Sequence, residues 1–101
     1  MKKHFVLKLN PCRPTFAEDM TDEERSIMQQ HVVFWTDLMD KGFVLAFGPV
    51  MDPKGIYGLG IIEADNEEQV KTFIANDPAS IINRYESYEM MAKTPGRNNN
   101  L

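Results

Sequence analysis

The segment TDEERSIMQQHVVFWTDLMDKG, residues 21–42, constrains the fold most, because it has the pattern of one long amphipathic helix. Thr21 with Glu24 three residues later has the spacing of a capping box, and Gly42 can end the helix in the left-handed conformation. We therefore predict a helix over residues 22–41. Its apolar residues recur every three or four positions and predict one buried face: Ile27, Met28, Phe34, Trp35, Leu38 and Met39.

His31 lies within this apolar face. Burying a polar group without a partner costs about 2–7 kcal/mol, so a histidine here needs either a hydrogen-bonding partner or a chemical role. On pattern alone, a satisfied core histidine is the commoner interpretation. The alternative is a general acid or base, because histidine titrates near neutral pH and acts in this way when a second group orients its ring.

A carboxylate is the usual orienting group, and the sequence offers several. Asp77 ends a second predicted helix, is followed by Pro78, and can point its short side chain into a cleft. Asp37 is six residues from His31 on the same helix and faces elsewhere. Three glutamates on predicted strands also remain candidates, so the sequence alone does not choose Asp77 over Glu63, Glu86 and Glu89.

The rest of the chain adds four strands and one helix. Period-two alternation, β-branched residues and a DPKG turn predict strands with a hairpin, and a capping-box spacing at Asp65 and Glu68 starts the second helix. The expected order is strand, helix, strand, strand, helix, strand, over residues 4–9, 22–41, 43–49, 56–64, 65–76 and 84–92. This order is that of the split βαβ, or ferredoxin-like, α+β fold with an antiparallel sheet.

The hairpin strands are apolar on both sides. Alternation places Phe43, Leu45 and Phe47 on one side of their strand, opposite Val44, Ala46 and Gly48. Because helices cover one face of this sheet, we expect a second copy of the chain to cover the other, in a homodimer or higher homo-oligomer. The alternative is a monomer that exposes a few apolar groups.

Gly58 and Gly60 stand two residues apart in the third strand and therefore share one face. Two glycines there leave a floor without side chains, which suits a pocket. A bulge, or close packing of a helix, is the alternative interpretation.

Composition narrows the classes of function. The 101 residues suit one domain, which we place at residues 1–92, with a disordered tail at 93–101. A net charge of −4 without a basic run argues against nucleic acid and membrane as partners. One cysteine, Cys12, and two distant histidines give no metal-ligand spacing, so we expect no metal. A single cysteine cannot form an internal disulfide and fits a reducing compartment, so we expect a cytoplasmic location.

Several motifs together resemble a known family. They are the run H-x(10)-G-x(5)-GP from His31 to Gly48-Pro49, the DPKG turn, the YGLGIIEA strand and the pair Asp77-Pro78. In this order and spacing, over about residues 5–92, they resemble the YciI-like (YCII-related domain) proteins. The loop RPTFAEDMTDEE followed by IMQQH is similar to one branch of that family.

The resemblance implies ferredoxin-like subunits that pair as a dimeric α+β barrel, and an active-site dyad that matches His31 and Asp77. The family is similar to muconolactone isomerases and includes a dehydrochlorinase of a chlorinated hydroxyhydroquinone. One departure concerns the segment after Asp77-Pro78, which lacks the glycine that often precedes the last strand of the family. Because this segment would border the mouth of the pocket, the resemblance does not predict the shape of the mouth or the identity of the substrate.

Taken together, the residues and the resemblance predict a small enzyme without a cofactor, of lyase or isomerase type. It would move a proton on a small cyclic or aromatic molecule, with His31 as general acid or base and Asp77 orienting it. The expected substrate contacts are Phe34, Trp35, Gly48, Pro49, Gly58 and Gly60. The alternatives are a non-catalytic binding or structural dimer and, by fold analogy alone, a cofactor-independent monooxygenase.

Overall fold

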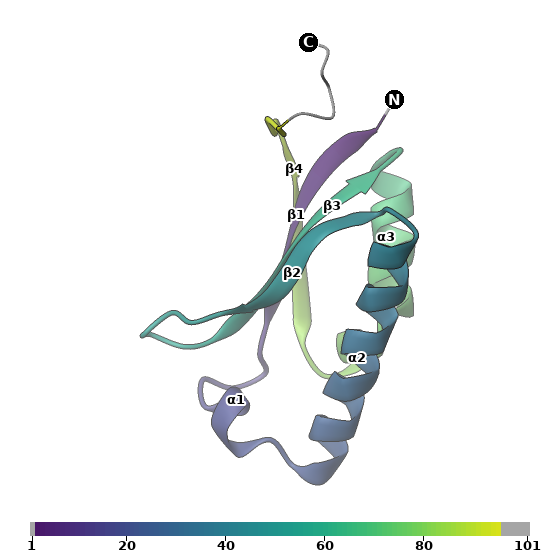
Figure 1. The fold of residues 1–101 in the computed structure, drawn as a ribbon. Coiled ribbons are helices and arrows are strands. Elements are labelled where there is room, and N and C mark those ends of the chain that lie inside the picture. Colours follow the sequence, from purple (N-terminus) through teal and green to yellow (C-terminus); the bar gives the residue numbers. More distant parts are fainter. Residues whose placement is uncertain (1, 96–101) are drawn as a thin grey trace.

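The computed structural model describes residues 2–95, which form one antiparallel sheet with helices on one side (Figure 1). The strands pair in the order β2-β3-β1-β4. The elements, in chain order, are β1 (Lys3–Asn10), α1 (Phe16–Asp19), α2 (Asp22–Asp40), β2 (Val44–Val50), β3 (Tyr57–Ala64), α3 (Glu67–Asn76), the 3₁₀-helix η1 (Pro78–Ile81) and β4 (Arg84–Met90). This topology confirms the predicted ferredoxin-like fold and adds α1, which the sequence pattern did not predict.

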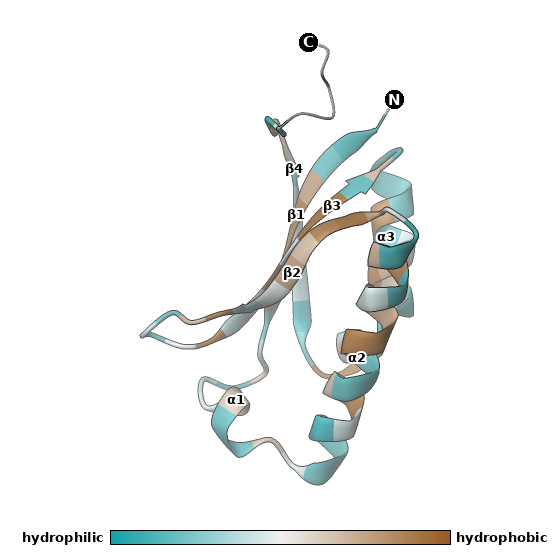
Figure 2. Ribbon diagram, in the orientation of Figure 1, coloured by the Kyte–Doolittle hydropathy of each residue, from teal (hydrophilic) through white to brown (hydrophobic). Residues whose placement is uncertain are grey.

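Helix α2 begins and ends where its local signals lie. Thr21 Oγ1 accepts a hydrogen bond from Glu24 N at 3.1 Å, and Glu24 Oε1 accepts one from Thr21 N at 2.9 Å, which completes the capping box. Gly42 follows the helix with a φ of 93°, a conformation that glycine adopts readily. Figure 2 shows hydrophobic residues on the side of α2 that faces the sheet.

The core lies between the sheet and helices α2 and α3. Side chains from both layers are buried there, and each contributes about 1.5–3 kcal/mol relative to exposure. Its members are Phe5, Leu7, Trp35, Leu38, Val44, Ile62, Ala64 and Val70. Every second residue of β1 (Phe5, Leu7 and Leu9) is buried, so alternation in this strand is as predicted.

A β-bulge in β2 contradicts the predicted sides of that strand. Val44 pairs with Ile62 and Ala46 pairs with Ile61, so Leu45 is an extra residue between two regular pairs. The extra residue shifts the alternation, and Val44 and Phe47 both pack on the core while Leu45 is 41% exposed. The prediction used the strict alternation of a regular strand and therefore put Leu45 on the same side as Phe47.

Helix α3 begins at Glu67 rather than at residue 65, and its N-cap lies one residue after the predicted one. Its N-cap is Asn66, whose Oδ1 accepts a hydrogen bond from Gln69 N at 2.9 Å, and not Asp65. The Asp65 backbone N–H instead donates to Gln69 Oε1 at 2.7 Å. Asp and Asn are comparable cap residues, so adjacent candidates cannot be separated by propensity.

The face of the sheet away from the helices carries mixed side chains. Cross-strand neighbours on this face include Val6 opposite Ile61 and opposite Tyr88, and Tyr88 is 59% exposed. His4 and Glu63 also pair here, with Nε2 and Oε2 2.9 Å apart. No helix covers this face within residues 2–95 (Figure 1).

The end of the chain is described only in part. Residues 91–95 follow β4 without helix or strand, and most of the predicted tail, residues 96–101, lies outside the described residues. The described helices include none long and apolar enough to cross a membrane.

Candidate active site

His31 and Asp77 lie side by side although 46 residues separate them. His31 Nδ1 is 2.8 Å from Asp77 Oδ2, and the two side chains are 13% and 0% exposed. Asp77 joins α3 to η1 and caps η1, because its Oδ1 accepts a hydrogen bond from Ala79 N at 2.9 Å. Pro78 occupies the first position of η1, where proline fits best, so local geometry fixes the direction of the Asp77 carboxylate.

Three side-chain donors converge on a single oxygen of Asp77. Besides His31, Trp35 Nε1 donates to Oδ2 at 2.9 Å, and the Tyr85 hydroxyl donates to the same oxygen. Trp35 Nε1 is also 3.0 Å from the Tyr85 hydroxyl oxygen. Trp35 stands one helical turn after His31 on the same side of α2, and Tyr85 pairs with the buried Leu9 and so points toward the helices.

These contacts set the charge of the site. Burial acts to raise the pKa of Asp77, but hydrogen bonds from His31, Tyr85, the Ala79 backbone and Trp35 outweigh it and hold that pKa below its usual value. Burial, and then the neighbouring Asp77 carboxylate, raise the pKa of Tyr85, so Tyr85 stays a neutral donor. Asp77 is therefore a carboxylate at neutral pH and only accepts hydrogen bonds.

The ionised Asp77 also assigns the tautomer of His31. Because a carboxylate cannot donate, the proton between the two groups belongs to His31 Nδ1. In a neutral ring the other nitrogen, Nε2, then carries the free lone pair. This is the arrangement in which a histidine accepts a proton and a carboxylate stabilises the resulting imidazolium.

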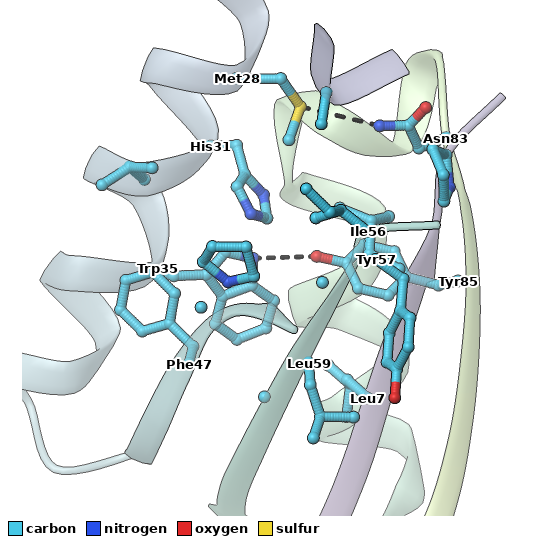
Figure 3. A pocket seen from close by; sticks show the side chains of 18 of the residues that line it. Leu7, Met28, His31, Trp35, Phe47, Ile56, Tyr57, Leu59, Asn83 and Tyr85 are labelled. Carbon is cyan, nitrogen blue, oxygen red and sulfur yellow. Dashed lines mark hydrogen bonds between the residues drawn. The ribbon is translucent and has the colours of Figure 1, made fainter. Parts of the chain in front are cut away.

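A cavity of about 270 Å³ opens beside His31 (Figure 3). Its lining comes from α2, the sheet and the segment around α1, and is mostly apolar. The polar side chains in it are His31, Tyr57, Asn83 and Tyr85, and the described lining contains no Lys, Arg, Asp or Glu. An apolar cavity with a few placed polar groups is typical of small-molecule sites.

The predicted contact residues mostly surround this cavity. Trp35, Gly48, Pro49, Gly58 and Gly60 line it together with His31, whereas Asp77 lies behind His31. Phe34 is absent from this lining; its ring packs edge-on against Trp35, with ring centroids 5.3 Å apart. Whether these residues touch a substrate stays a prediction.

The two glycines form a bare part of the cavity wall, and they differ in their surroundings. A Cβ on Gly58 would lie 3.2 Å from Leu9 Cβ, so the neighbouring strand approaches closely there. A Cβ on Gly60 would lie 3.6 Å from Phe47 Cβ, an ordinary contact. Close packing of β1 therefore accounts for Gly58, whereas a Cβ at Gly60 would make only ordinary contacts with β2.

The competing glutamates lie elsewhere. Glu63 pairs with His4, and Glu86 accepts hydrogen bonds from Tyr88 at 2.6 Å and from Asn10 at 2.7 Å. Glu89 is exposed. None of these three carboxylates is within hydrogen-bonding distance of His31 in the described contacts, which leaves Asp77 as its partner.

The segment between β1 and α2, for which the sequence pattern predicted no helix or strand, forms one wall of the cavity. Pro11, Phe16, Ala17 and Met20 all line it. Arg13 fastens this segment to the start of α2, because its Nη atoms donate to both Glu24 oxygens at 2.9 and 2.8 Å and its Nε donates to Asp19 at 2.8 Å. The hydrogen bonds that Glu24 accepts, first from Arg13 and then from Thr21 N, lower its pKa to about 2. Phe16, a large aromatic residue that is buried in this wall, is a sequence signal that could have pointed to it.

Fold and site together define a class of protein: a small ferredoxin-like α+β domain with a buried His–Asp pair at an apolar cavity. The chain matches the model of the YCII-related domain over residues 5–93 and belongs to that family, as the motifs indicated. The comparison with curated proteins finds no match.

Two solved structures are similar in fold. One is 5-chloro-2-hydroxyhydroquinone dehydrochlorinase from Burkholderia phenoliruptrix AC1100 in complex with 2,5-dihydroxybenzoquinone, with a TM-score of 0.65 and 16% identity over 88% of this chain and 95% of that one. The other is an uncharacterised protein from Thermotoga maritima, with a TM-score of 0.56 and 9% identity over 89% of this chain and 99% of that one. At these identities the likeness establishes the shared fold.

Proposed function

We propose that this protein is an enzyme of lyase or isomerase type that moves a proton on a small cyclic or aromatic molecule. One observation carries the proposal: His31 is held through Nδ1 by a buried carboxylate at the wall of an apolar cavity. The dehydrochlorinase of similar fold acts on a chlorinated hydroxyhydroquinone, which supports a ring compound as the substrate.

In the proposed reaction, His31 Nε2 removes a proton from the substrate and becomes an imidazolium that Asp77 stabilises. The released electron pair forms a new double bond. In an isomerisation, His31 returns the proton to another atom of the substrate; in an elimination, a leaving group departs with its bonding pair. General acid–base help of this kind contributes about 10²–10⁴-fold in rate.

The walls of the cavity suit a planar ring. Trp35 offers an aromatic surface, and Gly58 and Gly60 add no side chains to the part of the wall that β3 forms. Gly48 and Pro49 border the same space from β2. An engineered apolar cavity of about 150 Å³ in another protein binds benzene, so about 270 Å³ is enough for one substituted ring.

We also propose that two copies pair through the sheet face that lacks helices. The apolar and half-exposed residues of that face, such as Val6, Ile61 and Tyr88, support a second sheet as its cover. The pairing would give the dimeric α+β barrel that the family resemblance implies.

The test is solvent deuterium exchange and product formation, followed by NMR, on a panel of halogenated hydroquinones and unsaturated lactones. His31→Gln should lower the rate by about 10²–10⁴-fold. His4→Gln is the matched control, because His4 also pairs with a carboxylate but lies on the sheet face away from the cavity. Sedimentation equilibrium must give this control the mass of the wild type, because the same face is proposed to pair two copies. Unchanged rates in His31→Gln, or ring binding without turnover by the wild type, would favour the non-catalytic binding module instead.

A further inference from the structure

Asn83 is a buried side chain whose orientation the structure fixes. It lies between η1 and β4 and is 8% exposed. Its Oδ1 accepts a hydrogen bond from the Cys12 backbone N–H at 3.0 Å. Because a backbone N–H can only donate, the oxygen must face Cys12, and the amide nitrogen must face the opposite way.

That amide nitrogen points to a weak acceptor. Asn83 Nδ2 lies 3.7 Å from Met28 Sδ, and a thioether sulfur is a poor hydrogen-bond acceptor. Among the described residues, the two N–H donors of this amide thus have one weak partner between them. Buried amide donors normally have an oxygen partner. The Asn83 amide group at the cavity wall can therefore still donate a stronger hydrogen bond than the one it makes to Met28.

This donor shares one end of the cavity with His31. Figure 3 shows Asn83, Met28 and His31 together, and all three line the cavity. Met28 and His31 are three residues apart on α2, and the unbranched Met28 side chain can move aside when a better acceptor arrives.

We infer that the Asn83 amide binds an oxygen atom of the substrate and so selects a ring that carries a carbonyl or hydroxyl group. The inference rests on the proposed function and names its substrate class. An N–H donor on a carbonyl oxygen also favours the enolate that forms when His31 removes a proton from the adjacent carbon.

The charge of the lining restricts this oxygen further. The described lining offers no Lys or Arg, and a buried carboxylate, that of Asp77, lies behind His31. An incoming carboxylate or phosphate would lose its water without gaining a counter-ion. The oxygen that Asn83 selects therefore belongs to an uncharged ketone, enol or phenol.

The experiment compares two probes of nearly equal shape, acetophenone and α-methylstyrene. Acetophenone has a carbonyl oxygen where α-methylstyrene has a methylene group. Affinities are measured by NMR titration. The wild type should bind acetophenone about 3–10-fold more tightly, the value of one neutral hydrogen bond. Asn83→Asp keeps an acceptor for Cys12 N but removes the donor, so the preference should disappear or reverse.

Two further variants act as controls. Asn66→Asp makes the same chemical change at the N-cap of α3, where Asp caps equally well, and should keep the wild-type preference. Met28→Leu removes the competing sulfur and should keep or increase it. In the wild type, the side-chain amide signals of Asn83 should shift with acetophenone and not with α-methylstyrene, which tests the contact without any variant.

An equal preference in Asn83→Asp and the wild type, unmoved amide signals, or no binding of either probe would overturn the inference. The outcome is separable from that of the proposed function, because binding is measured without turnover. A lost preference in Asn83→Asp together with a catalytically silent wild type would contradict the proposed function alone.

Discussion

Asp77→Asn should destabilise the fold strongly although it changes a single atom. In the favourable orientation the Asn oxygen keeps the three side-chain donors, His31, Trp35 and Tyr85, and its NH₂ group then faces the Ala79 N–H, a donor facing a donor. An orphaned buried donor costs about 1–3 kcal/mol, and each of the three remaining hydrogen bonds weakens by about 1 kcal/mol without the charge. Relief of the buried charge offsets part of this loss, which leaves about 3 kcal/mol.

Urea unfolding followed by the fluorescence of Trp35, the single tryptophan, measures this free energy. A loss of about 3 kcal/mol is large against a typical total of about 5–15 kcal/mol but leaves the variant folded. Asp52→Asn is the control, because within residues 2–95 the one hydrogen bond to the Asp52 side chain comes from the exposed Lys54 N–H of its turn, and Asn serves equally there. Losses of similar size in both variants would refute the reasoning.

The same residue predicts a dependence on pH. The pKa of Asp77 is lowered in the folded state, so its stabilisation is fully present above the unfolded-state pKa of about 3.9 and is lost as pH falls through the folded-state pKa. Wild-type stability should therefore fall in acid more steeply than that of Asp77→Asn. Parallel curves for the two proteins would show that the Asp77 carboxylate is not stabilised by its donors.

Three other predictions concern the cavity and the sheet. Gly60→Ala should keep the free energy of unfolding or raise it by about 0.5 kcal/mol, and it should weaken ring binding. Gly58→Ala should lower the free energy of unfolding by about 1 kcal/mol, because the new Cβ would crowd Leu9. Urea unfolding measures the stability of both variants, and NMR titration measures ring binding. Glu24→Gln should speed amide hydrogen exchange in α1, since Arg13 loses a charged partner, and unchanged exchange would contradict this role of the ion pair. Tyr88→Asp should shift the chain toward monomer in sedimentation equilibrium, and an unchanged mass would exclude pairing through this face.

Local signals in the sequence determined α2, α3, the hairpin turn and the order of these elements along the chain. The capping box of α2 closes within three residues, and the turn closes by a hydrogen bond from Gly55 N to Asp52 O at 2.9 Å. Such contacts depend on neighbours in the chain, so residue type and spacing are enough to predict them. Hydrophobic periodicity likewise placed His31 on the buried side of α2.

Tertiary structure decided which groups meet. The bulge at Leu45 depends on how β2 pairs with β3, and register puts Glu63 opposite His4 rather than near His31. The sequence offered four carboxylates for His31, and only the meeting of α2 with the start of η1 selects Asp77. The roles of Tyr85 and Asn83 arise in the same way.

The physical reason is the distance along the chain. His31 and Asp77 are 46 residues apart, and Asn83 and Cys12 are 71 apart, so strand pairing and helix packing must bring each pair together. The pattern of apolar residues indicates which side of an element is buried, but it does not indicate which residues pair across strands. A one-residue shift of register exchanges the two faces of a strand. The sequence by itself thus determined a buried histidine on an amphipathic helix, and the tertiary structure supplied its carboxylate, its cavity and the amide beside it.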